Sequence, residues 1–146
     1  MTVPSHARAV IIGGGVVGCS IAYHLGKLGW RDVVLLERKQ LTCGTTWHAA
    51  GLIAQLRATQ NMTRLAKYSQ ELYFGLEAET GVVTGFKRNG SITVALTDER
   101  MEELRRSAAM ARAFGVEIDE ISPSDIASRY PGLSVDDAVG GVWLPK

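Results

Sequence analysis

Short apolar runs and a helical pattern alternate in the N-terminal part of the chain. Residues 7–12 form a wholly apolar run, typical of a strand that is buried on both faces of a parallel sheet. Glycines interrupt this run, and apolar residues then recur at helical spacing over residues 16–28. Gly29 can end this helix in a left-handed conformation, and residues 32–37 form a second apolar strand. A strand, a helix and a strand in this order predict a right-handed parallel β-α-β unit.

Two longer amphipathic helices are predicted further along the chain. A loop rich in Gly and Thr, residues 38–51, comes first and carries a helical turn at its end. The pattern then predicts helices over residues 62–80 and 98–114, the second capped by Thr97 or Asp98. The apolar sides comprise Met62, Leu65, Ala66, Leu72, Tyr73 and Leu76 in the first helix, and Met101, Leu104, Ala108 and Ala111 in the second.

The other strands have the character of an antiparallel sheet. The Asn89-Gly90 pair predicts a hairpin that joins residues 86–88 to residues 91–96. Further strands are expected at residues 116–121 and 138–144, and Ser122-Pro123-Ser124-Asp125 is a strong signal for the start of a short helix between them. The pattern therefore predicts an α/β fold with a Rossmann-like N-terminal unit. We place the nucleotide-binding segment at residues 1–85 and the start of a second, α+β region at residues 86–146.

Composition narrows the class of protein. The net charge is +1 with both signs mixed along the chain, so nothing supports a nucleic-acid partner. No apolar run approaches the roughly 20 residues of a membrane span, and the first residues do not form a secretory signal. Cys19 and Cys43 are too few for a disulfide framework or a metal site, and we expect no metal. These features favour a reducing, cytoplasmic compartment.

The glycine-rich turn is the first motif with a chemical meaning. Residues 13–18 read Gly-Gly-Gly-Val-Val-Gly and fit the G-x-G-x-x-G fingerprint of dinucleotide binding. In that fingerprint the glycines allow a tight turn, a close approach of the pyrophosphate and close packing of the helix on the strands. Glu37 ends the second strand, where its carboxylate can accept hydrogen bonds from ribose hydroxyls and repel a 2′-phosphate. The candidates from this motif are Gly13, Gly14, Gly15, Val16, Val17, Gly18 and Glu37.

This fingerprint does not distinguish NAD from FAD, and the next segment bears on that choice. Residues 41–52, Leu-Thr-Cys-Gly-Thr-Thr-Trp-His-Ala-Ala-Gly-Leu, closely resemble the flavin-binding start of the dimethylglycine and sarcosine dehydrogenases. These enzymes belong to the D-amino-acid-oxidase-like superfamily of FAD amine oxidoreductases. The resemblance is strong over residues 7–57 and looser over the rest of the chain.

The resemblance implies a cofactor and the residues that hold it. FAD is the implied cofactor, joined covalently through its 8α methyl group to a ring nitrogen of His48; a non-covalent, hydrogen-bonded histidine is the alternative. The resemblance also implies that Thr45 and Thr46 donate hydroxyl hydrogen bonds to the pyrophosphate or ribityl chain. Trp47 would pack on the flavin or fill the core. The candidates from this segment are Arg38, Gly44, Thr45, Thr46, Trp47, His48, Gly51 and Leu52.

The activity implied is the oxidation of an N-methylated amino acid such as sarcosine or dimethylglycine, with hydride transfer to flavin N5. Folate is an implied partner of the longer family members. The catalytic residues would lie beyond this sequence, so we expect the chain to be an N-terminal fragment that is inactive in isolation. Two alternatives remain open: a non-catalytic regulatory relative, which the histidine disfavours, and an NAD-dependent reductase, which the Thr-Thr-Trp-His run disfavours.

Overall fold

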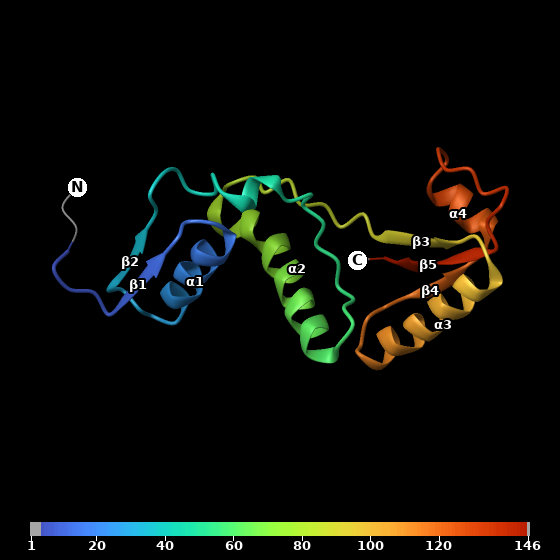
Figure 1. The fold of residues 1–146 in the computed structure, drawn as a ribbon, viewed down its shortest axis with the longest axis horizontal. Coiled ribbons are helices and arrows are strands. Elements are labelled where there is room, and N and C mark those ends of the chain that lie inside the picture. The colour runs from blue at the N-terminus through green and yellow to red at the C-terminus, as the bar shows by residue number, and fades with distance from the viewer. Residues whose placement is uncertain (1–3, 146) are drawn as a thin grey trace. The chain divides into compact units, whose positions relative to one another are not determined.

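The computed structural model describes residues 4–145, and the chain divides into two compact units (Figure 1). The first unit is Met1–Leu52 and the second is Ile53–Lys146. The sequence placed a boundary after residue 85, whereas the contacts group residues 53–85 with the second unit. The assignment of residues 1–85 to cofactor binding therefore remains a prediction about function.

The first unit contains the parallel β-α-β arrangement that the apolar pattern predicts. Strand β1 (Ala9–Ile12) and strand β2 (Val33–Leu36) are joined by helix α1 (Val16–Lys27). The two strands pair in parallel, with Ala9 opposite Val33 and Ile12 opposite Leu36. Gly29 follows the helix with a φ of 80°, as expected for a left-handed stop. The later loop forms one turn of 3-10 helix, η1 (Thr45–His48).

Only one face of the strand pair is covered within this unit. Helix α1 packs against both strands, and Ile11 on that side is buried. On the opposite side Val10 and Ile12 are 55% and 87% exposed, and Leu36, the register partner of Ile12, is 41% exposed. The apolar character that predicted a fully buried strand is therefore satisfied on one face only.

Within the described residues, the second unit combines three helices with a three-stranded antiparallel sheet. Its elements, in chain order, are α2 (Gln60–Thr80), β3 (Ser91–Ala95), α3 (Asp98–Ala113), β4 (Asp119–Ile121), α4 (Pro123–Arg129) and β5 (Gly140–Leu144). The strand order is β3-β5-β4, with β5 in the centre. The predicted stripe of α3 is buried in the core with Val142 and Leu144 of β5. Thr97 caps α3, and Ser122 and Asp125 form a capping box on α4, as the sequence predicted.

The predicted hairpin about Asn89-Gly90 is wrong. Residues 82–90 contain no strand, and β3 pairs instead with β5, which lies far along the sequence. Gly90 has a φ of 72°, and a Cβ at this position would collide with the ring of Trp143. The glycine is needed because an aromatic side chain of β5 lies against the backbone there. The hairpin signal thus reflects a local backbone requirement that has a different tertiary cause.

The apolar side predicted for α2 is only partly buried by the unit. Met62 and Leu65 are 51% and 58% exposed, while Ala66, Leu72, Tyr73 and Leu76 are half-buried. The fully buried side chains of this helix are the polar Thr63 and Gln70. Both make hydrogen bonds to residues 55–57: the Thr63 hydroxyl accepts from the Arg57 amide and donates to the Arg57 carbonyl, and Gln70 accepts from Gln55. Ala66 and Tyr73 share the helical spacing of Thr63 and Gln70, so the covered side of the helix combines apolar residues with these polar contacts.

Candidate functional site: a cavity at the glycine-rich turn

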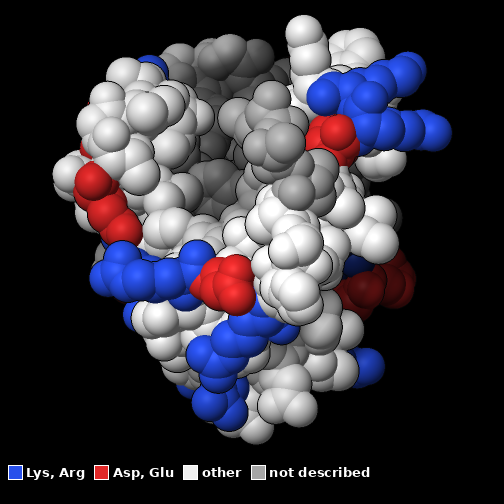
Figure 2. Space-filling view, turned by 90° about the vertical axis from the view of Figure 1, so that its left-hand side faces the viewer, with Lys and Arg blue, Asp and Glu red and all other residues white. Residues whose placement is uncertain are grey.

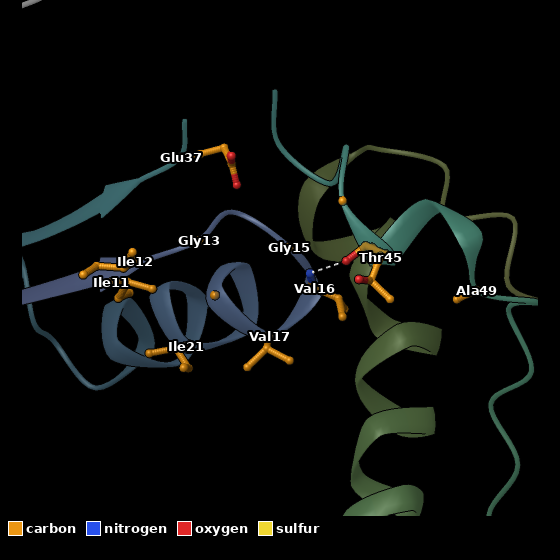
Figure 3. Close-up of a pocket in the computed structure, with 13 residues that line it drawn as sticks. Ile11, Ile12, Gly13, Gly15, Val16, Val17, Ile21, Glu37, Thr45 and Ala49 are labelled. Atoms are coloured by element: carbon orange, nitrogen blue, oxygen red, sulfur yellow. Dashed lines mark hydrogen bonds between the residues drawn. The ribbon is translucent and has the colours of Figure 1, made fainter. Parts of the chain in front are cut away.

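A cavity of about 550 Å³ lies beside the glycine-rich turn, entirely within the first unit (Figure 3). Volumes of roughly 300–1,000 Å³ are usual for small-molecule sites. Its walls come from the end of β1, the first turns of α1, the end of β2 and the loop that contains η1. The lining residues are Ile11, Ile12, Gly13, Gly15, Val16, Val17, Gly18, Ile21, Glu37, Gly44, Thr45, Thr46 and Ala49.

The glycines of the turn have distinct physical roles. Gly13 has a φ of 104°, a conformation that side chains with a Cβ rarely adopt. A Cβ on Gly18 would collide with the carbonyl oxygen of Gly13, so only glycine allows α1 to approach the end of β1 this closely. A Cβ on Gly14 would collide with the Leu41 side chain and lie 3.1 Å from the Glu37 Cβ. The turn is therefore compact because Gly13, Gly14 and Gly18 lack side chains.

Glu37 binds the glycine turn through its carboxylate. One oxygen accepts a 2.8 Å hydrogen bond from the Gly14 amide, and the other accepts a 3.0 Å hydrogen bond from the Lys39 amide. These amides, Gly14 above all, hold the pKa of the Glu37 carboxyl below its ordinary value of 4.5. The side chain is thus ionised at neutral pH and faces the cavity. Each carboxylate oxygen keeps a further lone pair for a hydroxyl donor such as a ribose.

The N-terminus of α1 faces the same cavity. The first amides of an α-helix have no acceptor within the helix, and the helix dipole adds partial positive charge there. Gly15 at the cap has no side chain to accept a hydrogen bond, but the Thr46 hydroxyl accepts from the Val16 amide at 2.9 Å (dashed line in Figure 3). Val17 and Gly18, which follow in the first turn, also line the cavity. An anionic group such as a diphosphate suits this end of the helix.

Two residues hold the loop on the glycine turn and were not predicted from the sequence. The Thr42 amide donates a 2.8 Å hydrogen bond to the Gly14 carbonyl, and Thr42 has a φ of 64°. Leu41 covers Gly14 with its side chain. Both residues begin the segment that resembles the flavin-binding start of the family, but no role was assigned to either, and no local pattern indicates these contacts. The apolar wall residues Ile11, Ile12 and Ile21 were likewise assigned to packing alone.

Trp47 and His48 lie next to each other at the end of η1. Their ring centroids are 4.0 Å apart with an interplanar angle of 34°, so the indole lies against the imidazole. Both side chains are exposed within this unit, Trp47 at 67%. An exposed imidazole is accessible to a reactive group, and the stacked indole limits the orientations that its ring can adopt.

The structure therefore brings together most of the predicted site residues. The predicted residues that line the cavity are Gly13, Gly15, Val16, Val17, Gly18, Glu37, Gly44, Thr45 and Thr46. Those outside its lining are Gly14, Arg38, Trp47, His48, Gly51 and Leu52, of which Gly14 contacts Glu37 directly. Leu52 is 86% exposed and ends the first unit. The glycine turn and residues 44–46 thus share one cavity. Trp47 and His48 follow these residues in the sequence but do not line the cavity.

The described part of the chain shows neither a membrane-spanning helix nor a metal-binding group of side chains. Across residues 4–145 no helix is both long and apolar enough to cross a membrane. Over the same residues no three or more His, Cys, Asp or Glu side chains are grouped so that they could hold a metal ion. Figure 2 shows one face of the molecule, on which basic and acidic side chains lie beside one another among uncharged residues.

Comparisons with known proteins agree with a flavin-type site. Residues 8–146 match the DAO family, described as FAD dependent oxidoreductase. The chain is 43% identical over 143 residues to human mitochondrial sarcosine dehydrogenase and 45% identical over 139 residues to rat mitochondrial dimethylglycine dehydrogenase. These alignments cover 97% and 95% of this chain and 16% of each relative. The mouse pyruvate dehydrogenase phosphatase regulatory subunit is 41% identical over 146 residues, which is 100% of this chain and 17% of that protein.

Solved structures show the same fold. The L-proline dehydrogenase from P. horikoshii superposes with a TM-score of 0.89 at 29% identity, covering 98% of this chain and 37% of that one. The chain spans about a sixth of the length of the curated relatives that it matches. The family match covers almost the whole chain and coincides with the glycine turn, Glu37 and the threonine loop. The chain belongs to the DAO family of FAD-dependent oxidoreductases.

Proposed function

We propose that this chain forms the FAD-binding part of an amine dehydrogenase or oxidase that acts on N-methylated amino acids. The observation that carries the proposal is the shared cavity of the glycine turn and the Gly44–Thr46 loop, from which the Trp47-His48 pair continues. The family match supplies the cofactor class, and several relatives are named for N-methylated substrates. One of these is a 4-methylaminobutanoate oxidase that is 40% identical over 142 residues.

The residues of the cavity fit the ADP half of FAD. The first turn of α1 presents amides to an anionic diphosphate, and Gly13 and Gly15 leave no Cβ over that space on their side of the turn. The ionised Glu37 carboxylate can accept hydrogen bonds from ribose hydroxyls and repels a phosphate at the same position. When bound, the flavin ring supplies two-electron redox chemistry, while the protein supplies orientation and electrostatics.

We further propose that His48 carries the flavin through a covalent bond. Its ring is exposed, follows the cavity loop directly and is stacked on Trp47. Intact-protein mass spectrometry after denaturation tests this on the full-length protein as its gene encodes it. The expected result is the mass of the chain plus one FAD, and a His48→Asn variant should lose the added mass while still binding FAD reversibly. A wild-type chain that binds FAD but carries no added mass would refute covalent attachment at His48 and support FAD as a non-covalent cofactor.

The substrate class is tested by turnover with an artificial electron acceptor. We expect the full-length protein to oxidise sarcosine or dimethylglycine and to release formaldehyde or transfer the one-carbon unit to folate. Glycine, which has no N-methyl group, is the matched control substrate. Turnover of glycine alone would move the proposal to the glycine-oxidase type of the family, one of whose members is 27% identical to this chain.

A non-catalytic regulatory role is the second candidate. It is favoured by the 41% identity to a phosphatase regulatory subunit over the entire chain. A full-length protein with no bound flavin and no amine turnover would support it. An NAD-dependent reductase is excluded if the purified protein shows flavin absorbance.

We also propose a compartment for the protein. The sequence favours a cytoplasmic location, whereas several relatives are named as mitochondrial. Cell fractionation distinguishes the two locations.

A further inference from the structure

Thr46 connects two parts of the candidate site: the N-terminus of α1, which suits a phosphate, and the turn that contains His48. Its hydroxyl oxygen accepts from the Val16 amide at 2.9 Å, across thirty positions of sequence. It is half-buried, whereas the other residues from Leu41 to Ala50 are exposed. A Cβ on Gly15 would lie 3.0 Å from the Thr46 hydroxyl oxygen, so this oxygen packs tightly against both Gly15 and Val16 at the start of α1.

This contact replaces a local helix cap. A helix normally takes its capping oxygen from the residue at the cap position, but Gly15 has no side chain. Thr46, in the loop of residues 38–51, supplies an oxygen from a distant segment, and it accepts from the first helical amide, Val16, where a local cap accepts from the second or third. The Thr46 carbonyl accepts a 3.2 Å hydrogen bond from the Ala49 amide, which closes the turn that contains His48. Thr46 therefore bonds to α1 through its side chain and to the His48 turn through its backbone.

The hydroxyl retains its own proton for a second partner. A threonine hydroxyl is one donor and two acceptors, and the bond from Val16 uses one acceptor only. Because Thr46 lines the cavity, that proton can be donated to an anionic oxygen there. An amide that donates to a hydroxyl, which in turn donates to an anion, forms a polarised chain of hydrogen bonds.

We propose that Thr46 is a positioning residue that locks the His48 turn onto the N-terminus of α1, so that phosphate binding and imidazole placement are coupled. This inference rests on the proposed function and deepens it. It differs from a simple phosphate contact, in which Thr46 would affect only the affinity for FAD. Under the lock, loss of the hydroxyl also misplaces His48 when the cofactor is fully bound.

The test combines two measurements on the full-length apoprotein and three variants. Thr46→Val removes the hydroxyl with little change of shape, and Thr46→Ser restores it. Thr97→Val is the control, because it removes a threonine hydroxyl from the start of a different helix, α3, where Thr97 is a local cap that accepts from the Arg100 amide at 3.2 Å. The first measurement is amide hydrogen exchange in peptides that cover residues 13–20 and 44–50. The second is the rate of covalent FAD attachment as a function of FAD concentration.

We expect Thr46→Val to speed exchange in both peptides, and to slow attachment at saturating FAD by about fivefold or more, as befits the loss of a cap. Thr46→Ser should behave like wild type, and Thr97→Val should change neither quantity. A Thr46→Val variant whose attachment is slowed only below saturation, or whose residues 44–50 exchange like wild type, would overturn the lock.

Failure of the proposed function gives a different result. A wild-type protein that gains no FAD mass refutes attachment at His48, whatever Thr46 does. The exchange of residues 13–20 and 44–50 then decides the proposal on Thr46 alone: faster exchange of both peptides in Thr46→Val supports the lock, and unchanged exchange of either peptide overturns it.

Discussion

Side chains in the loop of residues 38–51 make specific contacts with one another, as Trp47 shows. Its indole ring lies 4.0 Å from the imidazole of His48, centroid to centroid. The sequence left open whether Trp47 packs on the flavin or fills the core. Within the described residues it is exposed and stacked on its neighbour, so it does not fill the core of this unit.

This stacking gives a prediction for Trp47. We expect Trp47→Ala to slow the attachment of FAD to His48 several-fold, because a freely rotating imidazole spends less time in the reactive orientation. Trp47→Phe keeps an aromatic surface and should retain most of the rate. The measurement is the time course of covalent flavin by mass spectrometry. Equal rates for Trp47→Ala and Trp47→Phe would contradict an orienting role.

Glu37 gives a prediction about pH. Its folded-state pKa is lowered by the Gly14 and Lys39 amides, so the ionised form is favoured by folding. The stabilisation is complete above the unfolded value of 4.5 and is lost as pH falls through the lower folded-state value. Glu37→Gln turns one acceptor oxygen into a donor that faces an amide, and should destabilise the first unit at neutral pH.

Urea unfolding of wild type and Glu37→Gln over a range of pH measures this effect. The difference between the two proteins should shrink as pH falls below 4.5. Glu71→Gln, at an exposed position of α2, provides a control carboxylate in the second unit. A difference that stays constant down to strongly acidic pH would show that the two amide bonds do not depend on ionisation.

At the scale of elements, the packing of α1 on β1 depends on one glycine. The sequence motif predicts that Gly18 permits this close approach, and the collision of a Cβ with the Gly13 carbonyl supports the physical reason. Gly26 lies in the same helix with open space around it. Comparing the two positions therefore separates the effect of close packing at Gly18 from the low helix propensity that glycine has at any helical position.

We expect opposite effects from alanine at these two sites. Gly18→Ala should destabilise the first unit by about 2 kcal/mol, since it forces backbone atoms apart. Gly26→Ala should be neutral or stabilise it by up to about 1 kcal/mol, because alanine is the better helix former. Thermal or urea unfolding, followed with and without FAD, measures both. A stabilising Gly18→Ala would show that the turn can relax around the methyl group.

At the scale of the whole molecule, the two units differ in how completely they are packed. The second unit buries Ile126 of α4 fully, and the end of this side chain packs against Gly141 of the central strand β5. The first unit leaves Ile12 at 87% exposure on the uncovered face of its strand pair. Apolar strands exposed in this way are typical of a surface that other protein covers.

This contrast predicts the stability of two variants of the 146-residue chain. Ile126→Ala should lower the free energy of unfolding of the second unit by about 2–5 kcal/mol. Ile12→Ser should change that of the first unit by less than about 0.5 kcal/mol, since its side chain contacts little within the unit. In the full-length protein with FAD bound we expect Ile12→Ser to cost more, because the cofactor in the cavity that Ile12 lines, or further chain, can cover this side chain. An equal, small cost in both forms would indicate that the face stays exposed.

The sequence by itself determined the elements whose signals are local. The β-α-β unit, the capping residues Thr97 and Ser122 and the buried stripe of α3 follow from apolar periodicity and from caps that act within one turn. The glycine fingerprint and Glu37 were recognisable because a tight turn and a carboxylate at the end of a strand have fixed positions in the sequence.

Only the tertiary structure decided the contacts between distant segments. It paired β3 with β5 in place of the hairpin, and this pairing brings the ring of Trp143 over Gly90. It buried Thr63 and Gln70 of α2, because their polar groups meet the backbone and side chains of residues 55–57. It also placed the Thr46 hydroxyl on the Val16 amide. None of these contacts leaves a periodic trace in the sequence, since each depends on how separate segments meet in space.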